Sequence, residues 1–212
     1  SLHTPFSNPS PSNANSIAIQ SDDRIIIGGR FGEAHQTTRR KIARLNADGT
    51  LDGTFLNGLS GADDDITFVR LQSDGKILVT GFFNSINGSL RGHLARLNVD
   101  GSVDNTFLSG LSGANNLVNF ISELPDGKII IGGFFTSING IQRNKLARLN
   151  GDGSIDASFS SPLNPGLDYI YSVVSTASGR ILAGGSFQNV NGILRQHIAQ
   201  FDQNGTLDLD FG

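Results

Sequence analysis

The chain has 212 residues with no Cys, no Met and no Trp, and its formal net charge is −3. The missing thiols exclude disulfides and thiolate metal sites, and the small negative charge argues against binding to nucleic acid or to an anionic membrane. No apolar run is long enough to span a bilayer, so we expect no membrane insertion. Because the sequence begins at Ser1 and lacks Met, we expect it to be a segment processed from a longer precursor.

An internal repeat organises the chain. Landmark residues return at a constant step of 52 positions through four copies. They are Phe55, Phe107, Phe159 and Phe211; Gly29, Gly81, Gly133 and Gly185; and Arg44, Arg96, Arg148 and Gln200. Phe6 closes a fifth copy of the last segment alone, "SLHTPF", three residues closer to its neighbour than the repeat requires. A period of this length indicates a tandem β architecture, with one supersecondary unit per copy.

The second copy shows the elements of one unit in chain order. They are a strand "ITFVRLQ" (66–72), a turn "SDG" (73–75), a strand "KILVTGFF" (76–83), a turn in "INGSL" (86–90), and strands "RGHLARLN" (91–98) and "SVDNTF" (102–107). Asp-Gly and Asn-Gly favour hairpin turns because they tolerate positive φ. The apolar triplet Ile77-Leu78-Val79 predicts burial on both faces, and the Thr-Gly that follows permits close packing. No segment has the apolar spacing of a helix.

Four short antiparallel strands per copy favour an all-β chain folded as a β-propeller of four-stranded blades. We expect a single domain over 1–212, with blades at about 7–55, 56–107, 108–159 and 160–211. Residues 1–6 would then complete the last blade. A β-sandwich or another antiparallel array is the alternative. Four blades leave three arrangements open: a closed ring, a homodimer of eight blades, and a slice of a longer array.

The pattern Q-x-D-G-K-I-L-V-x-G-x-F followed by L-A-R-L-N-x-D-G-S-x-D-x-x-F resembles the delta-60 repeat, a bacterial β-propeller family of unknown function. Copies 2 and 3 match closely, whereas copy 1 departs at "SDDR" (21–24) and "FGEAHQ" (31–36). Copy 4 departs at "TASGR" (176–180) and "IAQFD" (198–202). The resemblance covers nearly the whole chain. It implies tandem arrays in large secreted or surface proteins of bacteria, and it implies no defined activity.

The N-x-D-G-[ST]-x-D motif is a candidate calcium site, because its oxygens are spaced as in a short calcium-binding loop. Its full copies in the central repeats are Asn98, Asp100 and Asp104, and Asn150, Asp152 and Asp156. It lacks the downstream Glu of an EF-hand. The favoured interpretation is therefore a hairpin whose Asn and Asp side chains bond local backbone N–H groups. We expect no obligatory cofactor.

A basic column is the second candidate. Its members occupy equivalent repeat positions, each with Lys or His two residues later on the same face of a strand. They are Arg39, Arg91, Arg143 and Arg195. Such clusters could bind carboxylated or sulfated glycans. The favoured interpretation is instead that these arginines pair with the turn aspartates and tie neighbouring blades together, because they recur in every copy.

Departures from the repeat are the third kind of candidate. Only copy 4 carries tyrosines, Tyr169 and Tyr171, which could stack on sugar rings. Copy 1 alone has Glu33 and His35, where an asymmetric polysaccharide-acting enzyme could have its site. The acidic run 63–65 occurs once. Drift in exposed loops is the favoured explanation of such departures.

We therefore expect a non-catalytic module of a bacterial secreted or cell-surface protein, acting in adhesion, recognition or spacing. Its partner would be a protein or a glycan on a cell surface. Weak contacts repeated over several blades would add through avidity. A glycan-binding lectin with repeated sites is one alternative. A polysaccharide-acting enzyme is the other, although the chain lacks a G-x-S-x-G motif and paired metal-binding histidines.

Overall fold

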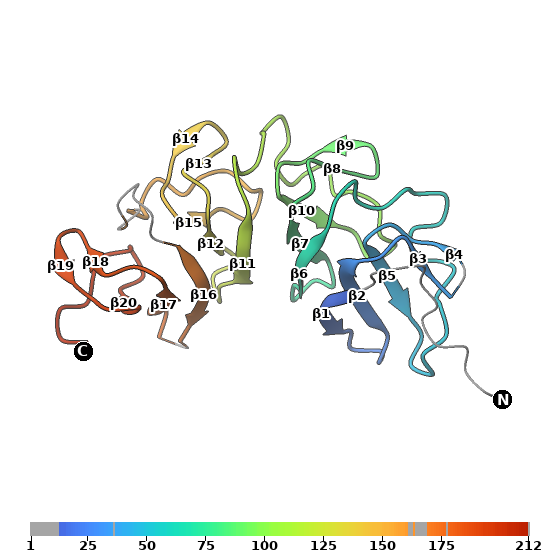
Figure 1. Ribbon diagram of the computed structural model, residues 1–212, viewed down its shortest axis with the longest axis horizontal. Helices are drawn as coiled ribbons and strands as arrows, with labels where there is room; N and C mark the ends of the chain where they lie inside the picture. Colours follow the sequence, from blue (N-terminus) through green and yellow to red (C-terminus); the bar gives the residue numbers. More distant parts are fainter. Residues whose placement is uncertain (1–12, 36, 161–162, 164–168, 177, 212) are drawn as a thin grey trace. The chain divides into compact units, whose positions relative to one another are not determined.

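A computed structural model of the chain describes residues 13–35, 37–160, 163, 169–176 and 178–211 (Figure 1). The secondary structure of these residues is β throughout, in agreement with the sequence. The chain divides into two compact units, Ser1–Asn105 (unit 1) and Thr106–Gly212 (unit 2). Each unit is described by itself. The expected pairing of residues 1–6 with the last blade lies outside the described residues.

Each unit contains two three-stranded antiparallel sheets, one per repeat, and these are the blades. Blade 1 has the order β1-β2-β5 and blade 2 the order β6-β7-β10. Their strands are β1 (Asn13–Ile19), β2 (Ile25–Arg30), β5 (Ile42–Leu45), β6 (Ile66–Leu71), β7 (Ile77–Gly81) and β10 (Leu94–Leu97). In unit 2, blade 3 has the order β11-β12-β15 and blade 4 the order β16-β17-β20. These strands are β11 (Val118–Glu123), β12 (Ile129–Gly133), β15 (Leu146–Leu149), β16 (Ile170–Ser175), β17 (Ile181–Gly185) and β20 (Ile198–Phe201).

A two-residue hairpin follows the central strand of every blade. The four hairpins are β3 (Glu33–Ala34) with β4 (Thr37–Thr38), β8 (Ser85–Ile86) with β9 (Ser89–Leu90), β13 (Ser137–Ile138) with β14 (Ile141–Gln142), and β18 (Asn189–Val190) with β19 (Ile193–Leu194). Asn87 and Gly88 both have positive φ, 49° and 75°. This is the backbone of a type I′ turn, so the predicted Asn-Gly turn is confirmed.

The fourth segment of each repeat is less regular than the sequence predicts. The expected strand 102–107 pairs with β10 through one isolated bridge, Leu97 to Val103. In copy 1, the Asp52 carboxylate accepts the backbone N–H of Thr54 at 2.9 Å. Such a local side-chain turn competes with ladder pairing and ends the strand. The blade therefore consists of three strands and a fourth segment joined by a single bridge.

The central strands β2, β7 and β12 are largely buried on both faces, as the apolar triplets predict, whereas Leu182, Gly184 and Gly185 of β17 are only half-buried. Ile77, Leu78 and Val79 of β7 have no exposed area. In unit 1, β6 packs against both β1 and β2. A Cβ added to Gly28 on β2 would lie 2.6 Å from Ile66 Cγ2 and 2.7 Å from Val69 Cγ1. The glycine therefore permits close stacking of blade 2 on blade 1.

Unit 2 repeats this packing, with β16 against β11 and β12. A Cβ on Gly132 would lie 2.6 Å from Ile170 Cγ2 and 2.9 Å from Val173 Cγ2. Asn119 Nδ2 also donates across the blades to the Ile170 carbonyl at 3.2 Å. Each pair of blades therefore shares one apolar core, with occasional side-chain hydrogen bonds to the neighbouring backbone.

Candidate functional site

The Asn-x-Asp-Gly motif forms a self-contained turn in the structure. In copy 2, Asp100 Oδ1 accepts the Ser102 N–H at 2.9 Å and the Ser102 hydroxyl at 2.6 Å. Asn98 Nδ2 donates to the same hydroxyl oxygen at 2.9 Å. These bonds lower the pKa of the Asp100 carboxyl, chiefly through the Ser102 hydroxyl and backbone N–H. The first two polar residues of the motif thus stabilise the turn that joins β10 to the fourth segment.

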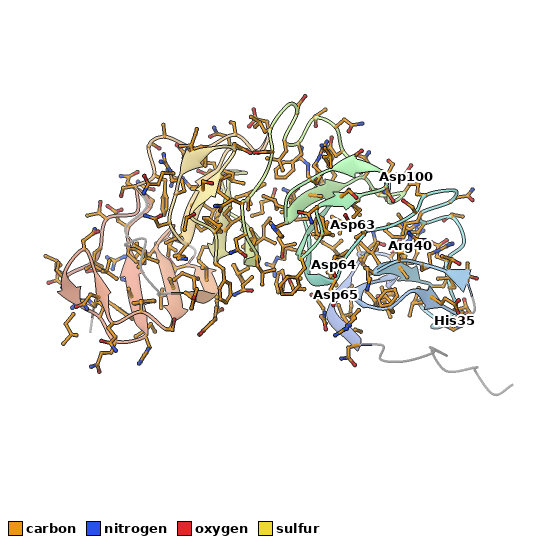
Figure 2. All side chains as sticks on the ribbon, turned by 45° about the horizontal axis from the view of Figure 1, so that its top comes forward. His35, Arg40, Asp63, Asp64, Asp65 and Asp100 are labelled. Atoms are coloured by element: carbon orange, nitrogen blue, oxygen red, sulfur yellow. The ribbon has the colours of Figure 1, made fainter. Side chains whose placement is uncertain are left out.

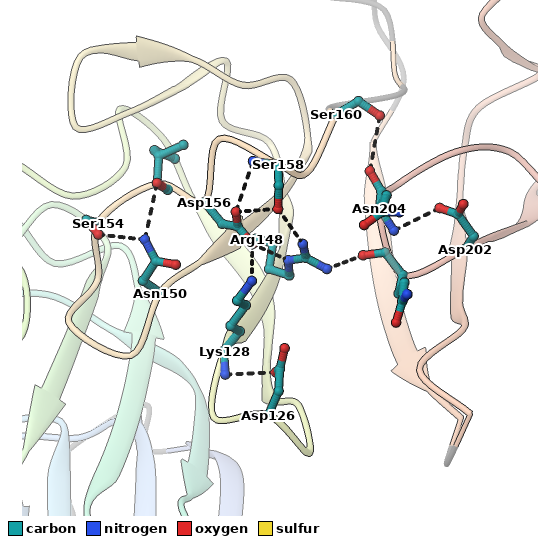
Figure 3. Close-up of polar contacts among 12 residues, drawn as sticks. Asp126, Lys128, Arg148, Asn150, Ser154, Asp156, Ser158, Ser160, Asp202 and Asn204 are labelled. Carbon is teal, nitrogen blue, oxygen red and sulfur yellow. Dashed lines mark hydrogen bonds and ion pairs between the residues drawn. The ribbon is translucent and has the colours of Figure 1, made fainter.

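The last aspartate of the motif lies in a polar network that Figure 3 shows for unit 2. Asp156 Oδ2 lies 2.6 Å from Arg148 Nε and 2.8 Å from Lys128 Nζ. Asp156 Oδ1 accepts the Ser158 N–H at 2.9 Å and its hydroxyl at 2.7 Å. Arg148 is anchored further by donating Nη1 to the Gln203 carbonyl of the next blade. The network therefore connects three segments of blade 3 with blade 4.

Charge pairing determines how the Asp156 carboxyl titrates. Burial by itself would raise its pKa, but the hydrogen bonds from Lys128, Ser158 and Arg148 outweigh that effect and hold the pKa well below 3.8. Asp52 follows the same balance, with Thr54, Arg44 and Arg24 as its donors. Both carboxylates are therefore charged at neutral pH and fully engaged by protein donors.

The same network occurs in every copy, with one informative change. In unit 1, Arg44 Nε and Arg24 Nη1 lie 2.7 and 3.2 Å from Asp52 Oδ2. Copy 2 uses Arg96 and Lys76 around Asp104, at 2.7 and 2.9 Å. Copy 4 replaces the buried arginine with Gln200, whose Nε2 donates to Asp208 Oδ2 at 2.7 Å. Sequence reasoning used this arginine as a landmark but missed its aspartate partner. The signal available in the sequence was the constant spacing of the aspartate from its two basic partners, 8 residues from the arginine and 28 from the Lys or Arg.

The arginines of the basic column form hydrogen bonds with backbone carbonyls close to them in the chain. Arg39, Arg91 and Arg143 each donate Nη1 to the carbonyl of the preceding residue, at 3.0, 2.8 and 2.8 Å. Arg195 does the same at 3.0 Å and also donates Nη2 to the Leu209 carbonyl at 3.1 Å. The turn aspartates are held by Arg44, Arg96 and Arg148 instead. The four column arginines are half-buried.

The acidic run of unit 1 is engaged in structural contacts. Asp63 accepts the N–H groups of Asn84 and Ser85, both at 3.0 Å. Asp65 lies 2.7 Å from Lys41 Nζ and 3.6 Å from Arg30 Nε. Figure 2 shows these aspartates grouped at one side of unit 1, apart from His35.

His35 occupies the first turn position of its hairpin with φ 48°, where Asn87 has φ 49°. Glu33 lies on β3 and pairs with Thr38 across the hairpin. The copy-specific histidine therefore replaces a turn asparagine.

An aromatic cluster lies in unit 2 at the position where unit 1 has the Asp65 ion pairs. Tyr169 is in the repeat position of Asp65, and Phe134 and Lys145 are in those of Arg30 and Lys41, the ion-pair partners of Asp65. The Phe134 and Tyr169 rings have centroids 4.3 Å apart with an interplanar angle of 33°. Tyr171 follows at 6.4 Å from Phe134. The structure thus brings together both predicted tyrosines and adds Phe134, which sequence reasoning missed.

Lys145 contacts two members of this cluster. Its Nζ lies 5.1 Å from the centroid of the Tyr169 ring and donates to the Phe134 carbonyl at 3.1 Å. The residue is only 4% exposed, so it orients the aromatic rings and is not itself offered to a ligand. Tyr171, in contrast, is 56% exposed. The outcome is an aromatic surface on which Tyr171 is exposed, whereas Phe134 and Tyr169 are half-buried.

The described residues do not support the calcium hypothesis. Among them, no group of three or more His, Cys, Asp or Glu side chains could hold a metal ion. The motif oxygens point at Ser and Thr hydroxyls, backbone N–H groups and basic side chains. The favoured interpretation, a hairpin that needs no calcium, stays a prediction.

Comparison with known proteins identifies the repeat. The family described as "Domain of unknown function (DUF5122) beta-propeller" matches residues 20–55, 72–107, 124–159 and 176–211. This result supports a β-propeller repeat family, and delta-60 remains a resemblance. No curated protein sequence matches the chain. Among the described residues, no helix has the length and apolarity needed to cross a membrane.

Several solved structures share the fold at low sequence identity. A gluconolactonase from Xanthomonas campestris aligns with TM-score 0.51 and 16% identity over 92% of this chain and 60% of its own. The extracellular domain of the putative hybrid two component system BT3049 from B. thetaiotaomicron aligns with TM-score 0.57 and 16% identity over 97% of this chain and 25% of its own. The WD40 β-propeller domain of Doa1 aligns with TM-score 0.51 and 10% identity over 92% of this chain and 53% of its own. These similarities show a β-propeller fold. The chain spans 60% or less of each structure's length.

Proposed function

Because the chain belongs to the DUF5122 β-propeller family, we propose that it is a non-catalytic recognition module of a bacterial secreted or cell-surface protein. Its partner is a glycan or protein on a cell surface. The observation that carries the proposal is the aromatic surface of Phe134, Tyr169 and Tyr171. Extracellular domains among the structural neighbours are consistent with this location.

The chemistry of the aromatic surface favours ring-shaped, uncharged ligand groups. A tyrosine that is 56% exposed can stack its face on the C–H face of a sugar or on an apolar side chain. Packing of Tyr169 between Phe134 and Lys145 holds the platform before a ligand arrives, which lowers the entropic cost of binding. Lys145, the one charged side chain among the described residues of the cluster, is buried, so it offers little attraction to an anionic ligand. The lectin alternative therefore shifts from repeated basic sites to one aromatic site in unit 2.

Affinity electrophoresis in gels containing single polysaccharides tests this proposal. We expect retardation by a neutral polysaccharide, and we expect Tyr171→Ala to remove it. Phe82→Ala is the matched control, because Phe82 is 48% exposed in unit 1 at the repeat position of Phe134. This variant should migrate as the parent chain does.

Other outcomes would point to the alternatives. Retardation that Tyr171→Ala leaves intact but Arg91→Ala and Arg143→Ala reduce would favour the basic column. Depolymerisation of a polysaccharide that His35→Ala abolishes would establish the enzyme. Absence of retardation by every polysaccharide would reject the glycan version of the proposal and leave a protein partner.

A further inference from the structure

Blade 1 in unit 1 and blade 4 in unit 2 each expose a face that no other blade of the same unit covers. Every internal contact between blades of one unit has two sides. A donor side on the later blade presents branched apolar residues, and an acceptor side on the earlier blade receives them at a glycine. Among the described residues, blade 1 has a donor side and blade 4 an acceptor side that no blade of its own unit contacts. We propose that blade 4 of one chain binds blade 1 of a second copy of the same chain, in the head-to-tail manner of the internal contacts.

The donor side of blade 1 is apolar and exposed. Ile17 on β1 occupies the repeat position of Val69, which packs on Gly28 of the preceding blade. Val69 is 2% exposed, whereas Ile17 is 62% exposed. Ile19, in the position of the partly buried Leu71, is 66% exposed. Side chains alternate along β1, so Ala18 faces blade 2 while Ile17 and Ile19 face away from it.

The acceptor side of blade 4 shows the complementary exposure. Ile198 on β20 is 49% exposed, although its counterparts Ile42 and Leu146 are fully buried under the following blade. A Cβ on Gly184 would have only the His197 carbonyl oxygen, at 3.8 Å, as a neighbour. At the equivalent glycine of blade 3, Gly132, the next blade's Ile170 and Val173 fill this space.

A cavity marks where the missing blade would lie. It has a volume of about 320 Å³ and is lined by Leu194, Arg195, Gln196, Ile198 and Phe211. Phe211 is the repeat phenylalanine, which is fully buried as Phe55 and Phe159. A Cβ on Gly101 would lie 3.0 Å from Phe55 Cε2, and one on Gly205 the same distance from Phe159 Cε2. Phe211 therefore lacks the glycine turn that covers its counterparts.

Blade 1 carries the missing turn. Gly49 is the repeat counterpart of Gly101 and Gly205, and all three have positive φ, 84°, 89° and 84°. A Cβ placed on Gly49 would meet no atom within 4 Å, so this turn faces open space. Blade 1 thus carries the apolar residues and the glycine turn, and blade 4 carries the glycine and the phenylalanine that would receive them. A second copy supplies each of these blades with its partner.

One polar contact is missing from this match. In unit 1, Arg44 Nη1 donates to the Val99 carbonyl of the next blade at 2.6 Å, and Arg148 bonds Gln203 in the same way. The fourth copy has Gln200 at this position, and its amide ends on Asp208. The contact between two chains therefore lacks one charge-assisted hydrogen bond to the Ala47 carbonyl of the second copy. It should be weaker than an internal contact, and Gln200→Arg should strengthen it.

The mass of the full chain in solution, measured by light scattering over a concentration series, tests the proposal. We expect at least two chains per particle at high concentration. Ile17→Glu and Ile198→Glu should each give monomers, because either places a charge on one side of the apolar contact. Leu90→Glu is the control on hairpin β8–β9, where Leu90 is 79% exposed. Its mass should be that of the parent chain.

Mixing the two monomeric variants distinguishes head-to-tail contact from every symmetric face-to-face contact. Ile17→Glu keeps an intact blade 4, and Ile198→Glu keeps an intact blade 1. Their equimolar mixture should form particles of two chains and no larger, because one good contact remains per pair. Gln200→Arg should lower the dissociation constant of the parent chain about tenfold, the effect of one added hydrogen bond to a charged group.

Contrary results would overturn the proposal. A parent chain that stays monomeric at every concentration would show that blade 4 does not bind blade 1 of a second copy. A mixture that fails to form pairs would exclude head-to-tail contact. Loss of association in Leu90→Glu would place the interface elsewhere. Circular dichroism of each variant should give the β spectrum of the parent chain. This control separates a loss of association from a loss of folding.

Discussion

Arg148 Nε lies 2.6 Å from Asp156 Oδ2, and both side chains are almost completely buried. This pair is the centre of the network that closes each repeat. Arg44 with Asp52 and Arg96 with Asp104 form the same contact in unit 1 at 2.7 Å. A buried pair of this kind contributes little over an apolar pair, but losing one partner leaves a charge without compensation. The network is therefore sensitive to single substitutions.

Replacement of Asp156 by Ala should destabilise the chain by about 3–5 kcal/mol, because Arg148 would remain buried without its carboxylate. Urea unfolding followed by circular dichroism measures this change. Asp208→Ala is the matched control, since its repeat partner is the neutral Gln200 and its ion-pair partner Arg180 is exposed. That variant should lose only about 1 kcal/mol. Equal losses in both variants would contradict the role given to the buried charge.

Stability should fall in acid. The pKa of Asp52 and Asp156 is lower in the folded chain than the ordinary value of 3.8. Their contribution is therefore fully present above pH 3.8 and is lost as the pH falls through the folded-state values. Urea midpoints compared between pH 7 and pH 3 should show a decrease in the parent chain. Asp156→Asn should flatten this dependence, and an unchanged slope would rule out the assignment of the effect to Asp156.

Gly132→Ala should destabilise unit 2 by about 1–3 kcal/mol, because the added methyl group overlaps Ile170 and Val173 of the next blade. Gly184→Ala is the matched substitution in blade 4, where the space is open. It should be neutral or slightly stabilising, since glycine is unfavourable inside a strand. Both are best compared by thermal unfolding in the Ile17→Glu background, so that association does not contribute. The reverse order of melting temperatures would disprove the stacking argument.

Removal of calcium should leave the melting temperature unchanged. The oxygens of Asp100 and Asp152 accept hydrogen bonds from Ser102 and Ser154, and Asp104 and Asp156 are paired with basic side chains. Differential scanning calorimetry with excess chelator, and then with added calcium, measures this directly. A lower melting temperature in chelator that calcium restores would establish the turns as calcium sites.

The sequence alone determined the repeat, the all-β class and the β-propeller fold, because step and turn chemistry are local properties. The positive φ of Asn87 and the double burial of Ile77 to Val79 followed from residue types. The fourth strand was over-predicted. Sequence pattern shows that Val103 is apolar, but it does not show that an aspartate side chain such as that of Asp52 ends the pairing by bonding its own backbone.

Only the tertiary structure decided which charges meet and which apolar residues remain exposed. Arg148 and Arg143 look alike in sequence, yet one is buried against Asp156 and the other bonds its neighbouring carbonyl. Ile17 and Val69 occupy the same repeat position, and their exposure differs because only Val69 has a blade in front of it. Pairing and exposure depend on contacts between segments far apart in the chain. A repeat pattern makes such positions equivalent, and only the fold distinguishes them.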